Sequence, residues 1–253
     1  MSEAHKEKGK IFVHRGDLAQ ARHYYELALM EERASGPTSS LTDTLGNLGN
    51  VCAMLGALDE ADRYYREVLA LQRAEPDPRA IGHTLVNLGN IHAESGYPDR
   101  ARPYYLEALD LLLPLQDHRA LGILYSNLGL QEAAAQHYEE AIAFFAQALD
   151  AHRVVGDEDG LAVTYSQLGK TFWDAGQADR AEKCLNNASE HFIKLGNEPG
   201  EAAVLRLLAS LYDRRGDRLS AIRCLERVVP IDHRYRLAQA EEDAARLGVL
   251  RQS

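Results

Sequence analysis

The sequence predicts an all-α fold, a right-handed solenoid of six helix hairpins closed by a C-terminal helix. The first observation is a series of alanines spaced by 40 residues without a slip: Ala21, Ala61, Ala101, Ala141, Ala181 and Ala221. The second is a helical period within each unit, because Leu45, Leu48 and Cys52 fall on one helix face. The third is that no segment of useful length alternates apolar and polar residues, as a half-buried strand does.

Three more series keep the same period of 40 residues. A packing glycine recurs at Gly9, Gly49, Gly89, Gly129 and Gly169, with Ala209 in the sixth place. A turn glycine recurs at Gly16, Gly56, Gly96, Gly176 and Gly216, with Gln136 in the fourth unit. A bulky residue follows each alanine by four positions, at Tyr25, Tyr65, Tyr105, Phe145, Leu185 and Leu225. Because glycine tolerates positive φ, the turn glycine ends the first helix of each hairpin.

The period also sets the organisation of the chain. We expect six units over residues 1–233, at about 1–40, 41–80, 81–120, 121–160, 161–200 and 201–233. One hairpin cannot bury its apolar face alone, whereas stacked hairpins share a continuous core. Residues 234–253 should form a capping helix and tail, with Leu237, Ala240, Ala244 and Leu247 on one side of a helix over 234–250.

Composition excludes several classes of protein. Lys and Arg number 28 against 38 Asp and Glu, so the net charge of −10 disfavours a general nucleic-acid binder. No apolar run reaches the length of a membrane span. Three cysteines without a CxxC motif suit a reducing compartment, so we expect a cytoplasmic protein. Gly169-Lys170-Thr171 resembles the end of a phosphate-binding loop, but Thr164 stands where that motif needs glycine. We therefore expect no cofactor, no metal site and no catalytic activity.

The repeated residues resemble the tetratricopeptide repeat. The third unit carries the pattern of that family most fully, with Gly89, His92, Gly96, Ala101, Tyr105 and Ala108. The unit of 40 residues and the words Asn47–Asn50 and Asn87–Asn90, which read NLGN, resemble the kinesin light chain and Pins/LGN types. Bacterial kinesin light chain-like proteins associated with bacterial tubulin are the most specific resemblance. The family implies a protein-binding scaffold. The fold alone does not identify the partner.

The resemblance places the first helix of each unit along a concave groove. A row of asparagines would then face a bound partner: Asn47, Asn50, Asn87, Asn90 and Asn127. An amide both donates and accepts hydrogen bonds, so it suits a peptide backbone. The alternative is that these amides bond neighbouring helices and hold the stack together.

Some members of the family grip an acidic C-terminus with a clamp of Lys, Asn and Arg side chains. Lys6 and Lys10 supply the first unit of such a clamp here, and Asn47 supplies the second. The third unit has His83 where the clamp needs Lys or Arg. The clamp is therefore only half present.

The fourth unit departs from its neighbours. Gln136 replaces the turn glycine, and Glu132 stands where Phe12, Phe172 and Tyr212 stand in other units. A His92–Glu132 contact is one interpretation. The favoured one is that the first helix of this unit is rotated or ends differently, which leaves both groups partly wet, since a buried unpaired carboxylate costs several kcal/mol.

A basic stretch lies near the C-terminus. Residues 214–236 hold seven arginines against three acidic residues, and a partner-binding patch would consist of Arg214, Arg215, Arg218, Arg223 and Arg227. Such a patch suits an acidic protein surface or anionic lipid. The alternative is a solvated face with local Asp–Arg pairs.

These observations predict a non-enzymatic scaffold with a protein partner, either a filament subunit or a peptide segment. The most specific hypothesis is an adaptor for a bacterial tubulin-like filament that can also link the filament to a membrane by peripheral contact. The alternative is a regulatory adaptor that binds a peptide in the groove. Self-association is a separate expectation, because the end of a solenoid can stack on another chain.

Overall fold

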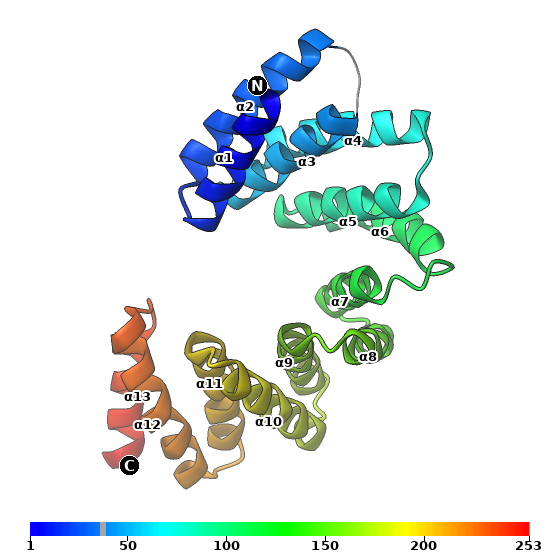
Figure 1. Cartoon of the computed structure of the whole chain (residues 1–253). Coiled ribbons are helices and arrows are strands. Elements are labelled where there is room, and N and C mark those ends of the chain that lie inside the picture. Colours follow the sequence, from blue (N-terminus) through cyan, green and yellow to red (C-terminus); the bar gives the residue numbers. More distant parts are fainter. Residues whose placement is uncertain (36–38, 253) are drawn as a thin grey trace. The chain divides into compact units, whose positions relative to one another are not determined.

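The computed structural model describes residues 1–35 and 39–252, and every secondary-structure element within them is a helix (Figure 1). The predicted all-α fold is confirmed. Residues 36–38, at the expected join between the first two units, and residue 253 lie outside the described part. The chain divides into two compact units, Met1–Asp117 (unit 1) and His118–Ser253 (unit 2).

Antiparallel helix pairs build both units. Apart from the last helix of the chain, each odd-numbered helix packs on the even-numbered helix that follows it, and within a unit each pair packs on the next. Unit 1 contains α1 (Ser2–His14), α2 (Leu18–Ser35), α3 (Ser39–Met54), α4 (Leu58–Ala74), α5 (Pro78–Glu94) and α6 (Pro98–Leu112). Unit 2 contains α7 (His118–Ala134), α8 (Tyr138–Val155), α9 (Glu158–Asp174), α10 (Ala178–Leu195), α11 (Glu198–Arg214), α12 (Arg218–Tyr235) and α13 (Ala240–Gln252).

The glycine and bulky-residue series meet inside each hairpin. A Cβ atom at Gly49 would lie 2.7 Å from Cε1 of Tyr65, and one at Gly129 would lie 2.8 Å from Cε1 of Phe145. The glycine therefore makes room for a side chain of the partner helix. All six alanines of the first series are fully buried. This contact fixes how closely the two helices of a hairpin approach.

The C-terminal cap differs from the prediction at its start. The last hairpin helix, α12, continues to Tyr235 because Ile231 and Asp232 remain buried within the fold. The chain then turns at Arg236, which has a φ of 53°, and α13 begins at Ala240. The predicted helix start at residue 234 is wrong for this reason.

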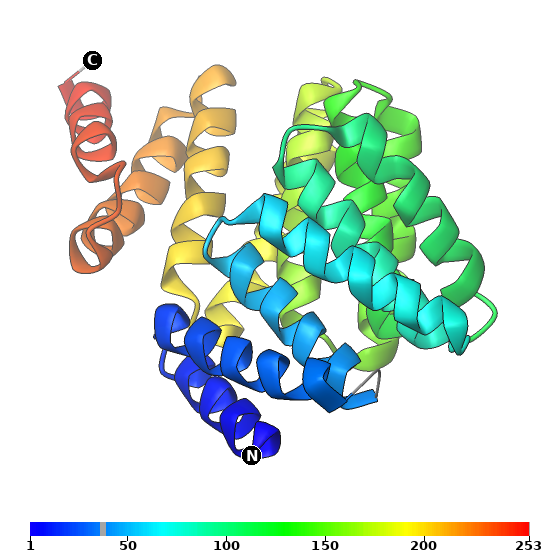
Figure 2. The ribbon, with the colours of Figure 1, turned by 90° about the horizontal axis from the view of Figure 1, so that it is seen from above.

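The buried side of α13 is also different from the predicted one. Asp243, Leu247 and Leu250 are its buried residues. The two leucines join a cluster with Ala209, Ala221 and Leu225, so α13 covers the last hairpin (Figure 2). Of the residues predicted to face the core, only Leu247 is buried.

Candidate functional site

A cleft of about 550 Å³ opens along the first helices of the hairpins of unit 1. Helices α1, α3 and α5 supply most of its lining. Six residues predicted from the sequence line it: Lys6, Lys10, Asn47, Asn50, His83 and Asn87. Asn90, on α5, is not among the lining residues, and Asn127 lies on α7 in unit 2. The structure thus brings together most of the groove residues that the sequence predicted.

The second asparagine of each NLGN word is used within its own hairpin. Asn50 Oδ1 accepts a hydrogen bond from the Tyr65 hydroxyl at 2.7 Å, and Asn90 Oδ1 accepts one from Tyr105 at 2.8 Å. Burial raises the pKa of both tyrosines, so both hydroxyls remain protonated donors. These contacts support the stacking interpretation for Asn50 and Asn90.

The first asparagine of each word behaves differently. Asn47 and Asn87 are half-buried on the cleft wall, and within the described residues neither side chain makes a hydrogen bond. Their amides are therefore available to a bound segment. Asn127 is also half-buried, and it takes part in an interaction of its own within the described chain.

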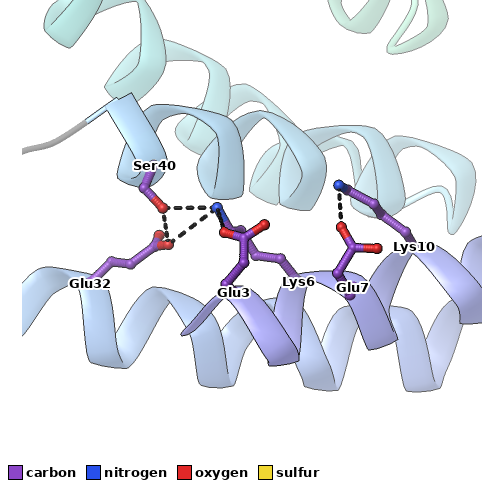
Figure 3. A network of polar contacts seen from close by, with 6 residues as sticks. All are labelled: Glu3, Lys6, Glu7, Lys10, Glu32 and Ser40. Atoms are coloured by element: carbon purple, nitrogen blue, oxygen red, sulfur yellow. Dashed lines mark hydrogen bonds and ion pairs between the residues drawn. The ribbon is translucent and has the colours of Figure 1, made fainter. Parts of the chain in front are cut away.

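Lys6 is the most buried charged residue of the cleft wall, with 7% of its surface exposed. Its Nζ donates to Ser40 Oγ at 2.8 Å, and it lies 2.8 Å from Glu3 Oε2 and 3.7 Å from Glu32 Oε1 (Figure 3). Burial lowers the pKa of Lys6, but the hydrogen bond and charge of Glu3 outweigh burial and leave the pKa raised. Lys6 joins α1, α2 and α3, so its charge is already engaged inside the protein.

The other two cationic candidates of the cleft also have acidic partners. Lys10 donates to Glu7 Oε1 at 2.6 Å on the same helix (Figure 3). His83 Nε2 lies 3.0 Å from Asp117 Oδ2, and Arg79 reaches the same carboxylate at 3.1 Å. Each contact directs a side-chain nitrogen of the expected clamp toward a carboxylate of this chain.

Carboxylates neutralise two of the five arginines of the predicted basic patch. Arg215 pairs with Asp179 and Glu182, and Arg227 pairs with the buried Glu201. Arg218 donates to the carbonyl of Leu250. Arg223 donates to Ser220, and the guanidinium of Arg214 lies 5.0 Å from the ring centre of Trp173. These contacts favour the alternative of local pairing over a free basic surface.

The pattern of the tetratricopeptide repeat matches overlapping segments of the sequence, residues 1–74, 40–113, 80–153, 120–186 and 160–232. The chain belongs to the tetratricopeptide repeat family. Members of this family bind protein partners through their repeats. No protein of curated function matches the sequence.

Several solved structures share the repeat fold. BtubC (BKLC) from P. vanneervenii is 22% identical with a TM-score of 0.64, over 74% of this chain and 78% of that one. A putative kinesin light chain with nearly identical repeats from Podosopora anserina is 13% identical with a TM-score of 0.63, over 77% and 96%. A STAND signal transduction ATPase with a repeat sensor from Pyrococcus horikoshii is 16% identical with a TM-score of 0.82, over 98% of this chain but 38% of that one. At these identities the likeness shows the fold.

The fourth repeat keeps its geometry despite its unusual residues. Gln136 adopts the turn conformation of the glycine that it replaces, with a φ of 62°. Glu132 is only 6% exposed, and its Oε2 lies 2.9 Å from Nδ1 of His137. His92 stacks on Tyr104 and lies 3.2 Å from Asp62 Oδ1. The expectation that the helix is displaced and that Glu132 is wet is therefore wrong, because His137 supplies a partner for the buried carboxylate.

The cysteines and the possible metal ligands show no arrangement for chemistry in the described chain. Burial raises the pKa of the Cys184 and Cys224 thiols, which keeps them protonated. In the described chain, no group of three His, Cys, Asp or Glu residues is arranged to hold a metal ion. None of the described helices is long and apolar enough to cross a membrane.

A cluster of three charged residues, two of them buried, escaped the sequence analysis. Arg206 on α11 pairs with Asp232, which is fully buried on α12, and with Asp243, which is buried on α13. Burial raises the pKa of Asp232, and its hydrogen bond with Asp243 raises it further against the lowering effect of Arg206. The available signal was positional, because Arg206 and Asp232 occupy the repeat positions of Lys6 and Glu32.

Proposed function

We propose that this chain is a non-enzymatic scaffold of the cytoplasm whose cleft in unit 1 binds an extended peptide segment of a protein partner. The observation that carries this function is the pair Asn47 and Asn87. They stand at the same position of successive repeats, on α3 and α5, and both line the cleft. Packing within the described chain uses neither amide.

The chemistry of the cleft favours recognition of the peptide backbone. Each amide offers one acceptor and two donor hydrogens, the same groups that an extended backbone presents. The lining carries charges of both signs, with Glu3, Asp43 and Asp77 opposing Lys6, Lys10 and Arg79. This balance favours no strongly charged segment.

A clamp for an acidic C-terminus finds little support. Lys6 is held by Glu3, Glu32 and Ser40, and releasing it would leave the buried Glu32 carboxylate without its counter-charge. His83 faces Asp117. These contacts support recognition of an extended backbone over a clamp on an acidic C-terminus, and we treat the filament adaptor as the second candidate.

The test compares two double variants in the same cleft. Peptides are first selected from a random unstructured library on the wild-type chain and then labelled for fluorescence anisotropy. Asn47→Ala with Asn87→Ala should weaken their binding at least about tenfold, as expected for the loss of about 1.4 kcal/mol, with an unchanged melting temperature.

Asn50→Ala with Asn90→Ala is the matched control, because it removes two other amides, each one helical turn away from Asn47 or Asn87. It should lower the melting temperature by removing the acceptors of the Tyr65 and Tyr105 hydroxyls. Peptide binding measured well below that temperature should persist. Unchanged binding in the Asn47/Asn87 variant would refute the proposed role of the cleft.

The second candidate is an adaptor for a bacterial tubulin-like filament. Support for it is the sequence resemblance to kinesin light chain-like proteins and the structural likeness to BtubC (BKLC). Co-sedimentation with assembled filaments, without binding to unassembled subunits, is the expected result. A membrane link has less support, since carboxylates hold Arg215 and Arg227; flotation with anionic vesicles tests it.

A further inference from the structure

Helix α1 exposes positions that later hairpins bury in the junction with the preceding repeat. Lys8 is exposed, whereas Leu48, at the same position of the next repeat, is fully buried. Ile11 is 47% exposed, whereas its counterpart Val51 is 1% exposed. The outer side of α1 is thus a junction face to which no preceding repeat of the described chain is docked.

Two aromatic rings and two cationic side chains contact one another on this face. Phe12 stacks on Tyr24 with ring centres 5.4 Å apart and planes 6° apart. Lys8 Nζ lies 5.1 Å from the Tyr24 ring centre, and the Arg15 guanidinium lies 6.0 Å from that of Phe12. Together with Ile11, these four residues form the α1 end face, which is apolar at its centre and basic at its edges.

The outer side of α13 has the opposite charge. Glu241, Glu242, Ala245 and Val249 are exposed on the side away from the buried Asp243, Leu247 and Leu250. Val249 is 65% exposed. We name these four exposed residues the α13 outer face, which is acidic at its start and apolar beyond it.

We propose that the α1 end face of one molecule docks on the α13 outer face of a second copy of this chain. Lys8 and Arg15 would meet Glu241 and Glu242, and Ile11 would cover Ala245 and Val249. The two faces are different surfaces, so the contact is head-to-tail and leaves each molecule of a pair with one unused face. Assembly continues from that face, and it weakens as salt screens the charges.

The faces can be inactivated one at a time. Sedimentation velocity over a concentration series should show wild-type species larger than a dimer. Lys8→Glu with Arg15→Glu removes only the basic face, and Glu241→Lys with Glu242→Lys removes only the acidic face. Each variant alone should stay monomeric, with association at least about tenfold weaker.

An equimolar mixture of the two variants gives the sharpest result. One variant retains an intact α13 outer face and the other an intact α1 end face, and the two reversed faces are again opposite in charge. The mixture should therefore recover assembly beyond a dimer, although neither variant assembles alone. Matched controls carry the same charge changes elsewhere, on exposed residues: Arg119→Glu with Lys183→Glu, and Glu139→Lys with Glu140→Lys in the first turn of α8. Both controls should assemble like the wild type.

Acidic residues also stabilise the start of α13 through the helix dipole, so circular dichroism must show that the lysine variant keeps its helix content. If it does not, Ile11→Asp on α1 supplies an independent test and should abolish association. A wild type that stays monomeric at every concentration would show that the two polar faces only keep the ends solvated, and would overturn the proposal. Assembly that survives either charge reversal would also overturn it.

Discussion

The first hairpin of unit 1 and the last hairpin of unit 2 share a feature that separates them from the hairpins between. Lys6 and Glu32 occupy the same repeat positions as Arg206 and Asp232, five repeats later. Each pair joins a cation on the first helix of a hairpin to a buried carboxylate on the second helix. The intervening repeats have no Lys, Arg, Asp or Glu at either position: they have Gly46 and Gln72, Val86 and Leu112, Ser126 and His152, and Ser166 and Phe192.

The two pairs differ in how well their charges are compensated. Lys6 has one buried carboxylate, Glu32, together with the exposed Glu3 and the Ser40 hydroxyl. Arg206 has two buried carboxylates, Asp232 and Asp243. The last hairpin therefore holds an excess of buried negative charge. In both hairpins the cation at this position has a carboxylate partner on the other helix of the same hairpin, and only the last hairpin adds a second carboxylate.

The largest effect should follow from removing the cation of the last hairpin. Arg206→Met leaves two buried carboxylates without a counter-charge, so we expect a loss of about 3–5 kcal/mol in the free energy of unfolding, measured with urea. Arg223→Met is the control, because Arg223 is exposed and donates only to Ser220; it should change stability by less than about 0.5 kcal/mol. Equal effects of the two substitutions would contradict the role assigned to Arg206.

A smaller loss should follow in the first hairpin. Lys6→Met leaves one buried carboxylate, Glu32, which keeps its hydrogen bond from Ser40, so we expect about 2–3 kcal/mol. The third repeat offers a natural replacement for the pair, Val86 with Leu112. Lys6→Val combined with Glu32→Leu should restore near wild-type stability, because apolar side chains can replace a buried ion pair. A double variant no better than Lys6→Met would show that the charges are needed for more than their mutual compensation.

The sequence predicted the hairpins well because each repeated residue has a single packing role. The alanines of the first series are buried in every repeat, and the glycines receive a side chain from the partner helix. The Asn–Tyr contacts were also within reach of the sequence. Tyr65 and Tyr105 accompany Asn50 and Asn90, whereas Phe145 accompanies Leu130, so the hydroxyl is present where the amide is present.

The charge contacts were harder to predict because their partners lie on other helices, far away in the sequence. The arithmetic over residues 214–236 omitted Asp179, Glu182 and Glu201, which neutralise Arg215 and Arg227. The sequence assigned Lys6 to a groove, and only the fold brought Glu32 within reach of it. The position of the chain reversal at Arg236 likewise depends on the burial of Asp232, which local periodicity does not show.

Acid pH should distinguish the two ends. Burial and the Asp243 hydrogen bond raise the pKa of Asp232 above its ordinary value of 3.8. A raised folded-state pKa means that the folded protein binds the proton more tightly than the unfolded chain. The stabilisation is complete below pH 3.8 and is lost as the pH rises through the raised pKa. Besides Arg206 and Asp243, His233 acts on this carboxylate.

The measurement is the difference in unfolding free energy between wild type and Asp232→Asn across a pH series. As the pH falls from neutral, the wild type should gain stability relative to the variant, whose amide cannot take up a proton. In the first hairpin, the contribution of Lys6 to stability depends on pH in the alkaline range. Its raised pKa gives a contribution that is complete below pH 10.5 and is lost at more alkaline pH. If the difference between wild type and Asp232→Asn does not change with pH, then Asp232 does not make the stability of the last hairpin depend on acid pH, and the prediction is wrong.

The smallest effect should come from the hydroxyl that accompanies Lys6. Ser40 Oγ accepts from Lys6 and donates to Glu32 Oε1 at 2.5 Å, whereas the last hairpin has Ala240 at the same repeat position and uses Asp243 instead. Ser40→Ala leaves both charges in place and removes one bridging group, so we expect a loss of about 1 kcal/mol. In the Lys6→Val, Glu32→Leu background the same substitution should change stability far less, because the bridged charges are gone. Equal losses in the two backgrounds would mean that Ser40 acts through the start of α3 and not through the ion pair.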